Sequence, residues 1–374
     1  MQPRDFFPLG IAEGNAFCNR QSETAILLEN IKSGKHSLLI ATRRYGKSSL
    51  ALHALKLSKL PYVETDFYLS RNEKIIEGYI LNSIVDLIGK ALGATEKLIT
   101  SIKNYVKNLR PKLEIATVPF KLELTVDTKT DPATNVKEAL SLLEYLLREK
   151  KQHAVLLMDE FQNVGVIAKG TGIEAATRNV AQKTQYLTFI FSGSNRKLLK
   201  SMFEDQNRPL YKLCWKITLA RISSEYYFEH LQKAARLPWK IELNSIILDR
   251  IILLTEKHPY YLNKLCDRFW TFCPKRPPML NKVDQAWKEI LQEEKSDAIK
   301  EILFLSLGQK NVLVQIAKGA TQLTGKQSML DLEMTSSSIL AALDGLEEKD
   351  MLEKQGDFYQ IINPVVKYYV LSAI

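Results

Sequence analysis

The chain has 374 residues, of which 45% are hydrophobic and 25% charged, as in a folded globular protein. This length exceeds one ordinary hydrophobic core, so we expect two or three domains. A membrane-spanning chain is excluded, because no apolar run approaches the length of about 18 residues that a spanning helix requires.

The four cysteines indicate a protein of a reducing compartment. They are Cys18, Cys214, Cys266 and Cys273, and they have neither the spacing of a metal site nor the density of a disulfide scaffold. We therefore expect free, buried thiols. The N-terminal stretch MQPRDFFPLGIAEGN lacks the apolar segment of a secretory signal, so we expect a cytoplasmic protein.

The formal net charge of +10 suggests a nucleic-acid partner, but its distribution argues against a basic C-terminus. Residues 300–374 contain 7 Lys and no Arg against 9 Asp or Glu, which leaves them at net −2. The positive excess therefore lies in the first 299 residues.

Five short apolar runs rich in β-branched residues predict the strands of the first 222 residues. They are SLLIA (37–41), YVETDFYL (62–69), AVLLMDEF (154–161), LTFIFSGS (187–194) and WKITLARI (215–222). Three of them are nearly continuous in apolar residues, which favours strands buried on both faces of a parallel sheet. Helical patterns at 47–58, 73–92 and 136–149 alternate with the runs and predict an α/β domain with a five-stranded parallel sheet.

The remaining segments complete a three-domain prediction. Residues 112–127 have two alternating runs around Val118-Pro119 and predict a β-hairpin insertion at about 110–130. Residues 223–298 are helical by pattern and predict an all-α lid. Residues 299–374 read as three helices, beginning with one over 300–319, and a hairpin, which is the winged-helix arrangement. The first domain then covers 1–222.

The segment ATRRYGKSSL predicts a phosphate-binding loop. It lies between a buried strand and a helix, which is where a loop can direct backbone N–H groups at phosphates. Gly46 permits close backbone approach, Lys47 reaches the β- and γ-phosphates, and Ser48 is the hydroxyl on the magnesium side. Ala41 replaces the first glycine of G-x-x-x-x-G-K-[ST], and alanine is tolerable there unless φ must be positive.

Two carboxylates at the end of AVLLMDEF predict a metal and water site. An acid at the carboxyl end of a parallel strand lies at the edge where ligands bind. Asp159 would hold Mg²⁺, and Glu160 would orient and deprotonate an attacking water. Loop and acids together predict a site for ATP or ADP with Mg²⁺.

Two further features leave alternatives open. In FIFSGSNRK, Ser194 or Asn195 could reach the γ-phosphate or the water, but a plain turn with Asn195 as helix cap would look similar. Arg43 and Arg44 could neutralise phosphate, pair with acidic residues or face solvent. The candidate arginine fingers are Arg178, Arg208 and Arg221.

The order of these motifs resembles the archaeal and bacterial ATPases of the STAND group, relatives of the AAA+ and origin-recognition ATPases. The motifs are F-x-N-R-x-x-E (Phe17, Asn19, Arg20, Glu23), ATRRYGKSSL, LLMDEFQ, FSGSNR and KHPYYLNKL. The resemblance covers nearly the whole chain and implies an ATPase core, a helical lid and a C-terminal winged helix. It also implies a nucleotide-controlled switch with slow hydrolysis.

The resemblance implies roles for individual residues. Arg20 matches an arginine near the nucleotide, Ser194 matches the polar sensor, and His258-Pro259 match the lid motif that closes on the nucleotide. His258 beside a proline could equally be a helix-start signal. The nucleotide-contacting loop residues would be Thr42, Arg43, Arg44, Tyr45, Gly46, Lys47, Ser48 and Ser49. The lid shows no clear arginine in the sensor role.

The C-terminal helix predicted to face a partner is acidic. The stretch SSSILAALDGLEEKDM carries Asp344, Glu347, Glu348 and Asp350 against Lys349 alone, which phosphate would repel. We therefore expect this C-terminal region to pack on the core or to bind a protein partner, rather than to bind DNA through this helix. An ATP-dependent DNA-binding protein and a non-hydrolysing nucleotide-binding scaffold are the alternatives, and the chain could be a monomer or a nucleotide-dependent oligomer.

Overall fold

The computed structural model describes residues 5–93, 100, 113–118, 121–126, 130–167, 172–274 and 279–372. Packing divides the chain into two compact units. The α/β unit comprises Gln21–Ala41 and Leu50–Leu219, and the helical unit comprises Met1–Arg20, Thr42–Ser49 and Ala220–Ile374. Among the described residues, no helix combines the length and the apolar character needed to span a membrane.

The α/β unit is built on one parallel sheet, as predicted. Its strands are β1 (Ser37–Ala41), β2 (Tyr62–Asp66), β5 (Ala154–Asp159), β6 (Leu187–Gly193) and β7 (Trp215–Leu219). The strands lie in the order β2-β5-β6-β1-β7 and all pairs are parallel. Every residue of β1, β5 and β6 is buried, which explains why these three runs are continuously apolar.

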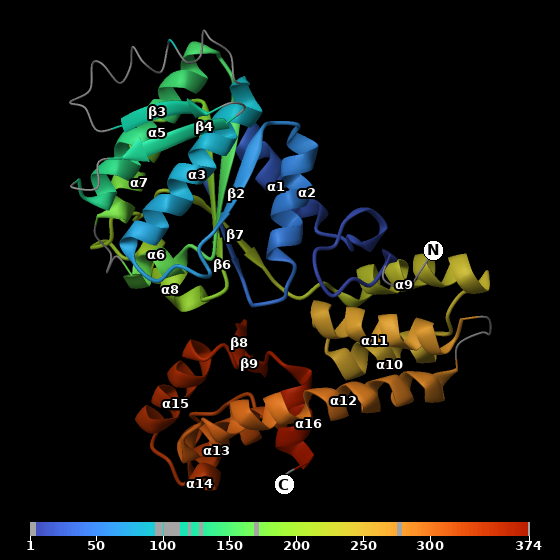
Figure 1. Ribbon diagram of the computed structural model, residues 1–374. Helices are drawn as coiled ribbons and strands as arrows, with labels where there is room; N and C mark the ends of the chain where they lie inside the picture. The colour runs from blue at the N-terminus through green and yellow to red at the C-terminus, as the bar shows by residue number, and fades with distance from the viewer. Residues whose placement is uncertain are drawn as a thin grey trace. The chain divides into compact units, whose positions relative to one another are not determined.

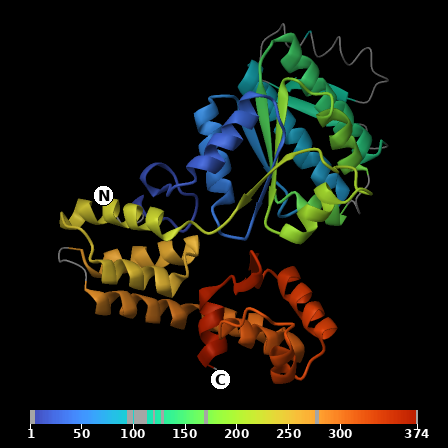
Figure 2. The same ribbon diagram turned by 180° about the vertical axis from the view of Figure 1, so that it is seen from behind.

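Helices cover both faces of the sheet. They are α1 (Gln21–Lys32), α2 (Lys47–Ser58), α3 (Glu73–Leu92), α5 (Pro132–Glu149), α6 (Gln162–Ile167), α7 (Ile173–Ala181) and α8 (Arg196–Glu204). Figures 1 and 2 show α3, α5 and α7 on one face and α1 on the other. The side chains of Asn72 and Asp131 accept hydrogen bonds from the first turns of α3 and α5, so both helices begin at a capped residue.

The predicted hairpin insertion is confirmed within the described residues. Strands β3 (Leu113–Val118) and β4 (Lys121–Val126) pair antiparallel, with Val118 opposite Lys121. The pair lies between β2 and β5 in the chain, as expected. Pro119, placed at the bend by the sequence, lies outside the described residues, as do the flanking residues 101–112 and 127–129.

The helical unit has one continuous hydrophobic core that runs from Phe6 to Val370. Its elements include η2 (Gly14–Ala16), α9 (Ser224–Trp239), α10 (Ser245–Thr255), α11 (Pro259–Phe272), α12 (Leu280–Leu303), α13 (Leu307–Ala317), α14 (Lys326–Leu332), α15 (Ser336–Glu348), β8 (Leu352–Gln355), β9 (Phe358–Ile361) and α16 (Pro364–Ser372). Three helices followed by an antiparallel hairpin occupy the last part of the chain, in the predicted order.

Two features of this unit differ from the prediction. The helix predicted over 300–319 is two helices, because α12 continues to Leu303 and α13 begins only after Ser306. Ser306 and Gln309 form a reciprocal capping box, which starts a new helix at that point. The final helix α16 was not predicted; its Tyr369 hydroxyl donates to the Leu291 carbonyl of α12 at 2.8 Å. The three-domain division stays a prediction, and its boundary at 298/299 falls inside α12.

Candidate functional site

The predicted phosphate loop (Thr42–Ser49) connects β1 to α2 and begins that helix. Gly46 has φ of +84°, and no described heavy atom lies within 4 Å of where its Cβ would stand. The backbone angle, and not crowding, therefore favours glycine there. Lys47 is the first residue of α2, so its N-terminal position in the helix offers backbone N–H groups and a positive dipole to an anion.

Ala41, which stands where such loops usually have glycine, is the last residue of β1 and pairs with Leu219. A strand residue has negative φ, which alanine adopts without strain. It is also 1% exposed, so a small side chain suits the position. The missing glycine is therefore compatible with the loop that follows.

The loop side chains divide into exposed and buried groups. Arg43 and Arg44 are exposed, whereas Thr42, Tyr45, Lys47 and Ser49 are buried, and Ser48 is half-buried. The Ser49 hydroxyl accepts the Ala12 N–H at 3.0 Å and so holds the N-terminal segment. The metal-side role predicted for the Ser48 hydroxyl stays a prediction.

The acid pair lies at the carboxyl end of β5, in the α/β unit. Asp159 Oδ1 accepts from the Ser192 hydroxyl at 2.5 Å and from the Glu160 N–H at 2.9 Å. Two donors on one oxygen fix the orientation of the carboxylate. Ser192 was missed by the sequence prediction, because a serine inside an apolar strand gives no local sign of its partner.

Glu160 is oriented by the neighbouring strand. Its backbone is in the left-handed region, with φ of +50°. Its Oε2 accepts from the Ser194 hydroxyl at 2.8 Å and from the Gln162 side-chain amide. Ser194 is thus joined to the predicted catalytic acid. Asn195 instead accepts from the Leu198 N–H at 3.0 Å, so it is the helix cap that the alternative interpretation described.

The close approach of Gln162 depends on Gly193. A Cβ on Gly193 would stand 1.8 Å from the Gln162 Oε1 and 2.9 Å from its Cδ. Gln162 is buried, so it has little room to withdraw. A side chain at position 193 would therefore force the end of Gln162, which donates to Glu160, to move.

In the helical unit, the H-P-Y-Y motif packs against the loop. The Tyr45 and His258 rings meet edge to face at 5.1 Å, and the Arg44 guanidinium lies 4.0 Å from the centre of the Tyr260 ring. His258 precedes α11 and Pro259 is its first residue, so the motif also starts the helix.

His258 is a buried histidine whose ring nitrogen Nδ1 has no hydrogen-bond partner among the described residues. The residue is 3% exposed. Burial, with help from Arg221 and Arg44, lowers the pKa of His258 to about 3. The ring is therefore neutral at physiological pH and keeps hydrogen-bonding capacity for a ligand.

Arg20 supports the backbone of the loop. Its guanidinium donates to the Tyr45 carbonyl at 3.3 Å and to the Ala220 carbonyl at 2.6 Å. It is 6% exposed. The structure therefore places Arg20 at the loop, with contacts to main-chain oxygens that position the loop. A role for Arg20 near the nucleotide stays a prediction.

The candidate arginine fingers all have bound partners. Arg208 donates to Glu174 at 2.6 Å, and that acid is fully buried. Arg178 donates to the Tyr211 carbonyl at 2.9 Å. Arg221 pairs with Glu353 at 2.5 Å. These contacts are structural, and a role for any of the three at a nucleotide stays a prediction.

The residue types fit a magnesium nucleotide. Lys47, a helix N-terminus and a loop glycine suit phosphates, and Ser48 and Asp159 provide the hydroxyl and carboxylate oxygens that Mg²⁺ prefers. In the part of the chain that the structure describes, no group of three His, Cys, Asp or Glu residues could hold a metal.

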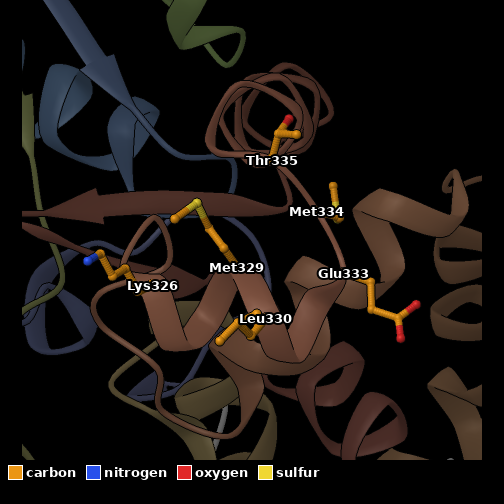
Figure 3. A pocket seen from close by; sticks show the side chains of 6 residues that line it. All are labelled: Lys326, Met329, Leu330, Glu333, Met334 and Thr335. Atoms are coloured by element: carbon orange, nitrogen blue, oxygen red, sulfur yellow. The ribbon is translucent and has the colours of Figure 1, made fainter.

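A cavity of about 490 Å³ beside α14 has a different chemistry. Figure 3 shows the side chains that line it, which are Lys326, Met329, Leu330, Glu333, Met334 and Thr335. Its wall is largely methionine and leucine, and its residues come from one short helix and the turn after it. This largely apolar cavity is therefore a poorer candidate for binding phosphate than the loop at residues 42–49.

Comparison with known proteins gives structural neighbours only. No protein-family model matches the chain. No curated protein matches it. A Walker-type ATPase of Pyrococcus abyssi is similar, with a TM-score of 0.68 and 16% identity over 98% of this chain and 99% of that one.

Two proteins of Aeropyrum pernix are similar at lower scores. The ORC2 protein, in ADPNP-ADP complexes, gives a TM-score of 0.57 and 13% identity over 100% of this chain and 98% of that one. The ORC1 protein, in complex with DNA, gives a TM-score of 0.50 and 12% identity over 100% of this chain and 96% of that one. At these identities the likeness establishes the fold, and it confirms the predicted class of a P-loop α/β core followed by helical regions.

Proposed function

We propose that the chain binds ATP or ADP with Mg²⁺ and hydrolyses ATP slowly as a nucleotide-controlled switch. One observation carries the proposal: the phosphate loop follows β1, a fixed acid pair ends β5, and both strands are neighbours of β6 in a parallel sheet. Carboxyl ends of parallel strands lie at one sheet edge, which is where α/β proteins bind ligands. The shared fold with a Walker-type ATPase supports the same conclusion.

The proposed roles follow from the contacts of each residue. Lys47 binds the β- and γ-phosphates, and Ser48 and Asp159 hold the Mg²⁺, which neutralises phosphate charge when it is bound. Glu160 orients a water and takes its proton. Ser194 and Gln162 hold the Glu160 carboxylate, so they position the base.

The switch rests on how the loop is embedded in the helical unit. Arg20, His258 and Tyr260 contact residues 44 and 45, so a change in the loop conformation would reach the N-terminal segment and the start of α11. We propose that His258 and Pro259 close on the nucleotide, with the neutral His258 as an acceptor. The STAND resemblance and the lack of a clear lid arginine favour slow turnover and tight binding.

Hydrolysis separates a switch from a non-hydrolysing scaffold. Glu160→Gln keeps the shape of the side chain and removes the base, so it should bind ATP with unchanged affinity and release phosphate at least about 100-fold more slowly. Glu149→Gln, at an exposed helix end, is the matched control. If wild-type protein with Mg²⁺ releases no more phosphate than Glu160→Gln, the chain is a scaffold and the enzyme proposal is wrong.

The partner we propose is a protein. In α15, Asp344 and Glu348 are exposed. The Lys349 ammonium that follows them donates to the Phe304 carbonyl at 2.9 Å and to Gln309. The one lysine beside these acids is therefore already engaged, and the helix offers little to phosphate.

DNA binding is the second candidate, because the first 299 residues hold the positive excess and one structural neighbour is an ORC1 protein in complex with DNA. Binding to a duplex through backbone contacts would fall steeply as salt rises. We expect weak binding with a shallow salt dependence. A tight, steeply salt-dependent affinity in fluorescence anisotropy would favour the DNA-binding alternative.

A further inference from the structure

One carboxylate of the C-terminal hairpin binds the phosphate loop. Glu353, in β8, is 6% exposed. Its Oε1 accepts from the Tyr45 hydroxyl at 2.8 Å, and its Oε2 accepts from the Thr42 hydroxyl at 3.4 Å. All of these residues belong to the helical unit. The hairpin therefore holds the loop at two points with a single side chain.

Arg221 joins the Glu353 contact to two further chain segments, and we call these linked residues the junction. Its Nε donates to the Glu353 Oε1 at 2.5 Å. Its other nitrogens donate to the Glu256 carbonyl at 2.5 Å and to the Ile361 and Ile362 carbonyls at 3.0 and 3.1 Å. The Arg221 side chain is 3% exposed. The guanidinium thus joins the start of α9, the turn before α11 and both strands of the hairpin.

The charges of the junction balance. Glu256 lies 3.8 Å from Arg221 and forms an ion pair with Lys367, so two acids face two bases. The side-chain amide of Gln360 donates to Glu256 at 3.1 Å. Removing one partner from such a buried network leaves a charge without compensation, so the network favours one arrangement over partly open ones.

Tyr45 transmits this arrangement to the residues that bind phosphate. Its hydroxyl is held by Glu353, its carbonyl by Arg20 and its ring by His258. Gly46 and Lys47 follow it directly in the chain. A residue fixed at three points cannot shift alone, so a change in the backbone around Gly46 requires the Glu353 contact to change too.

We propose that Glu353 is a positioning residue that locks the phosphate loop to the C-terminal hairpin and slows the release of bound nucleotide. The proposal rests on the proposed function, because it concerns the regulation of the same loop. The hairpin is the sensing element: while Glu353 binds Thr42, Tyr45 and Arg221, the loop keeps its shape around the phosphates. When the hairpin leaves, the loop relaxes and nucleotide exchanges.

The test measures dissociation of a fluorescent ADP by stopped flow. Tyr45→Phe removes only the hydroxyl that Glu353 accepts, and we expect ADP to leave about tenfold faster, the effect of losing one buried hydrogen bond to a charged group. Glu353→Gln should do the same. The double variant should be no faster than the faster single variant, because both break one contact.

Tyr369→Phe is the matched control, because it loses a hydroxyl bond of 2.8 Å in the same unit but away from the loop. It should leave ADP dissociation unchanged. Thermal unfolding is measured alongside: a merely structural Glu353 would lower the melting temperature of the variants and leave ADP dissociation unchanged, which would overturn the proposal.

A measurement on nucleotide-free protein distinguishes failure of the proposed nucleotide binding from failure of the proposed Glu353 contact. In nucleotide-free protein, hydrogen exchange of residues 352–361 should speed up in Tyr45→Phe and stay at the wild-type rate in Tyr369→Phe. If wild-type protein binds no ADP, the proposed function fails, while faster exchange would still support the loop–hairpin lock. Unchanged exchange in Tyr45→Phe would overturn the lock even if ADP binds.

Discussion

The phosphate loop and the acid pair are supported in opposite ways. Asp159 and Glu160 are held by Ser192 of the adjacent strand β6 and by Ser194 directly after it, 33 and 34 residues later in the same unit. Tyr45 of the loop is held by Glu353, which lies 308 residues later. The acids are therefore a local property of the α/β unit, whereas the loop geometry depends on the helical unit. If the proposed function holds, changes near the acids should affect turnover, and changes near Tyr45 should affect nucleotide binding.

The largest effect on the acid pair is expected from Gly193→Ala. The new Cβ would overlap the Gln162 amide, which would have to leave Glu160. Overpacking of this kind costs about 1–3 kcal/mol of folding free energy. We expect ATP hydrolysis to fall by about tenfold or more with little loss of ATP affinity, as measured by phosphate release and by nucleotide titration.

Gly78→Ala in α3 is the control, since no described heavy atom lies within 4 Å of its Cβ position. A second check combines Gly193→Ala with Gln162→Ala, which should recover stability but not hydrolysis. If Gly193→Ala weakens ATP binding as much as hydrolysis, the separation between loop and acids is wrong.

A smaller effect is expected from Ser192→Ala. Asp159 would lose its shortest hydrogen bond and its fixed orientation. Residues that orient a metal ligand typically contribute about tenfold to metal affinity. The Mg²⁺ concentration for half-maximal hydrolysis should rise by about that factor.

Ser83→Ala provides the comparison, because it breaks a buried hydroxyl pair with Thr65 in the same unit. It should leave the Mg²⁺ requirement unchanged. An equal Mg²⁺ requirement for Ser192→Ala and wild type would mean that Asp159 does not bind the metal.

His258 gives the helical unit a pH dependence. The unfolded chain protonates this histidine below about pH 6.5, while the folded pKa of about 3 keeps it neutral. Stability is therefore fully present above pH 6.5 and is lost as the pH falls toward 3. Between pH 7.5 and 5.5 we expect a loss of about 1–1.5 kcal/mol in wild type that His258→Gln lacks.

Urea unfolding followed by tryptophan fluorescence measures this difference, since Trp239, Trp270 and Trp287 all lie in the helical unit. Burial also lowers the pKa of His36 and His230, but both remain in the variant and cancel in the comparison. Identical pH dependence in wild type and His258→Gln would contradict a buried, neutral His258.

The smallest effect is expected from Ala41→Gly, which restores the usual glycine. Ala41 has strand geometry, so the change should alter ATP affinity by less than about twofold and cost about 0.5–1 kcal/mol of stability. Nucleotide titration and urea unfolding check both values. A large gain in ATP affinity would show that alanine impairs the loop.

The sequence predicted the features that depend on local pattern. Buried parallel strands are continuously apolar, so the five strands and the turns after 41 and 159 were found from periodicity and from motif. The order of the strands in the sheet and the register of their pairing were not predicted from the sequence. Ser192 meets Asp159 only because β5 and β6 pair with Met158 opposite Phe191, and sequence spacing does not encode that register.

The contacts of the phosphate loop could not be predicted from the sequence, for a different reason. Glu353 lies in an ordinary alternating strand, L-E-K-Q, and looks like a solvated acid. Arg221 was noted only as a candidate arginine finger. Their burial and pairing depend on the fold of the helical unit, in which Tyr45 contacts His258 and Thr42 contacts Glu353, 311 positions away.

Equilibrium binding of ATP with Mg²⁺ to Lys47→Ala and wild type tests the central claim most directly. Lys56→Ala, an exposed lysine on the same helix, is the control for lost charge. We predict one saturable nucleotide per chain for wild type and Lys56→Ala, and affinity at least about 100-fold weaker for Lys47→Ala. Equal binding by Lys47→Ala and wild type, or no saturable binding by wild type, would contradict the assignment of the loop.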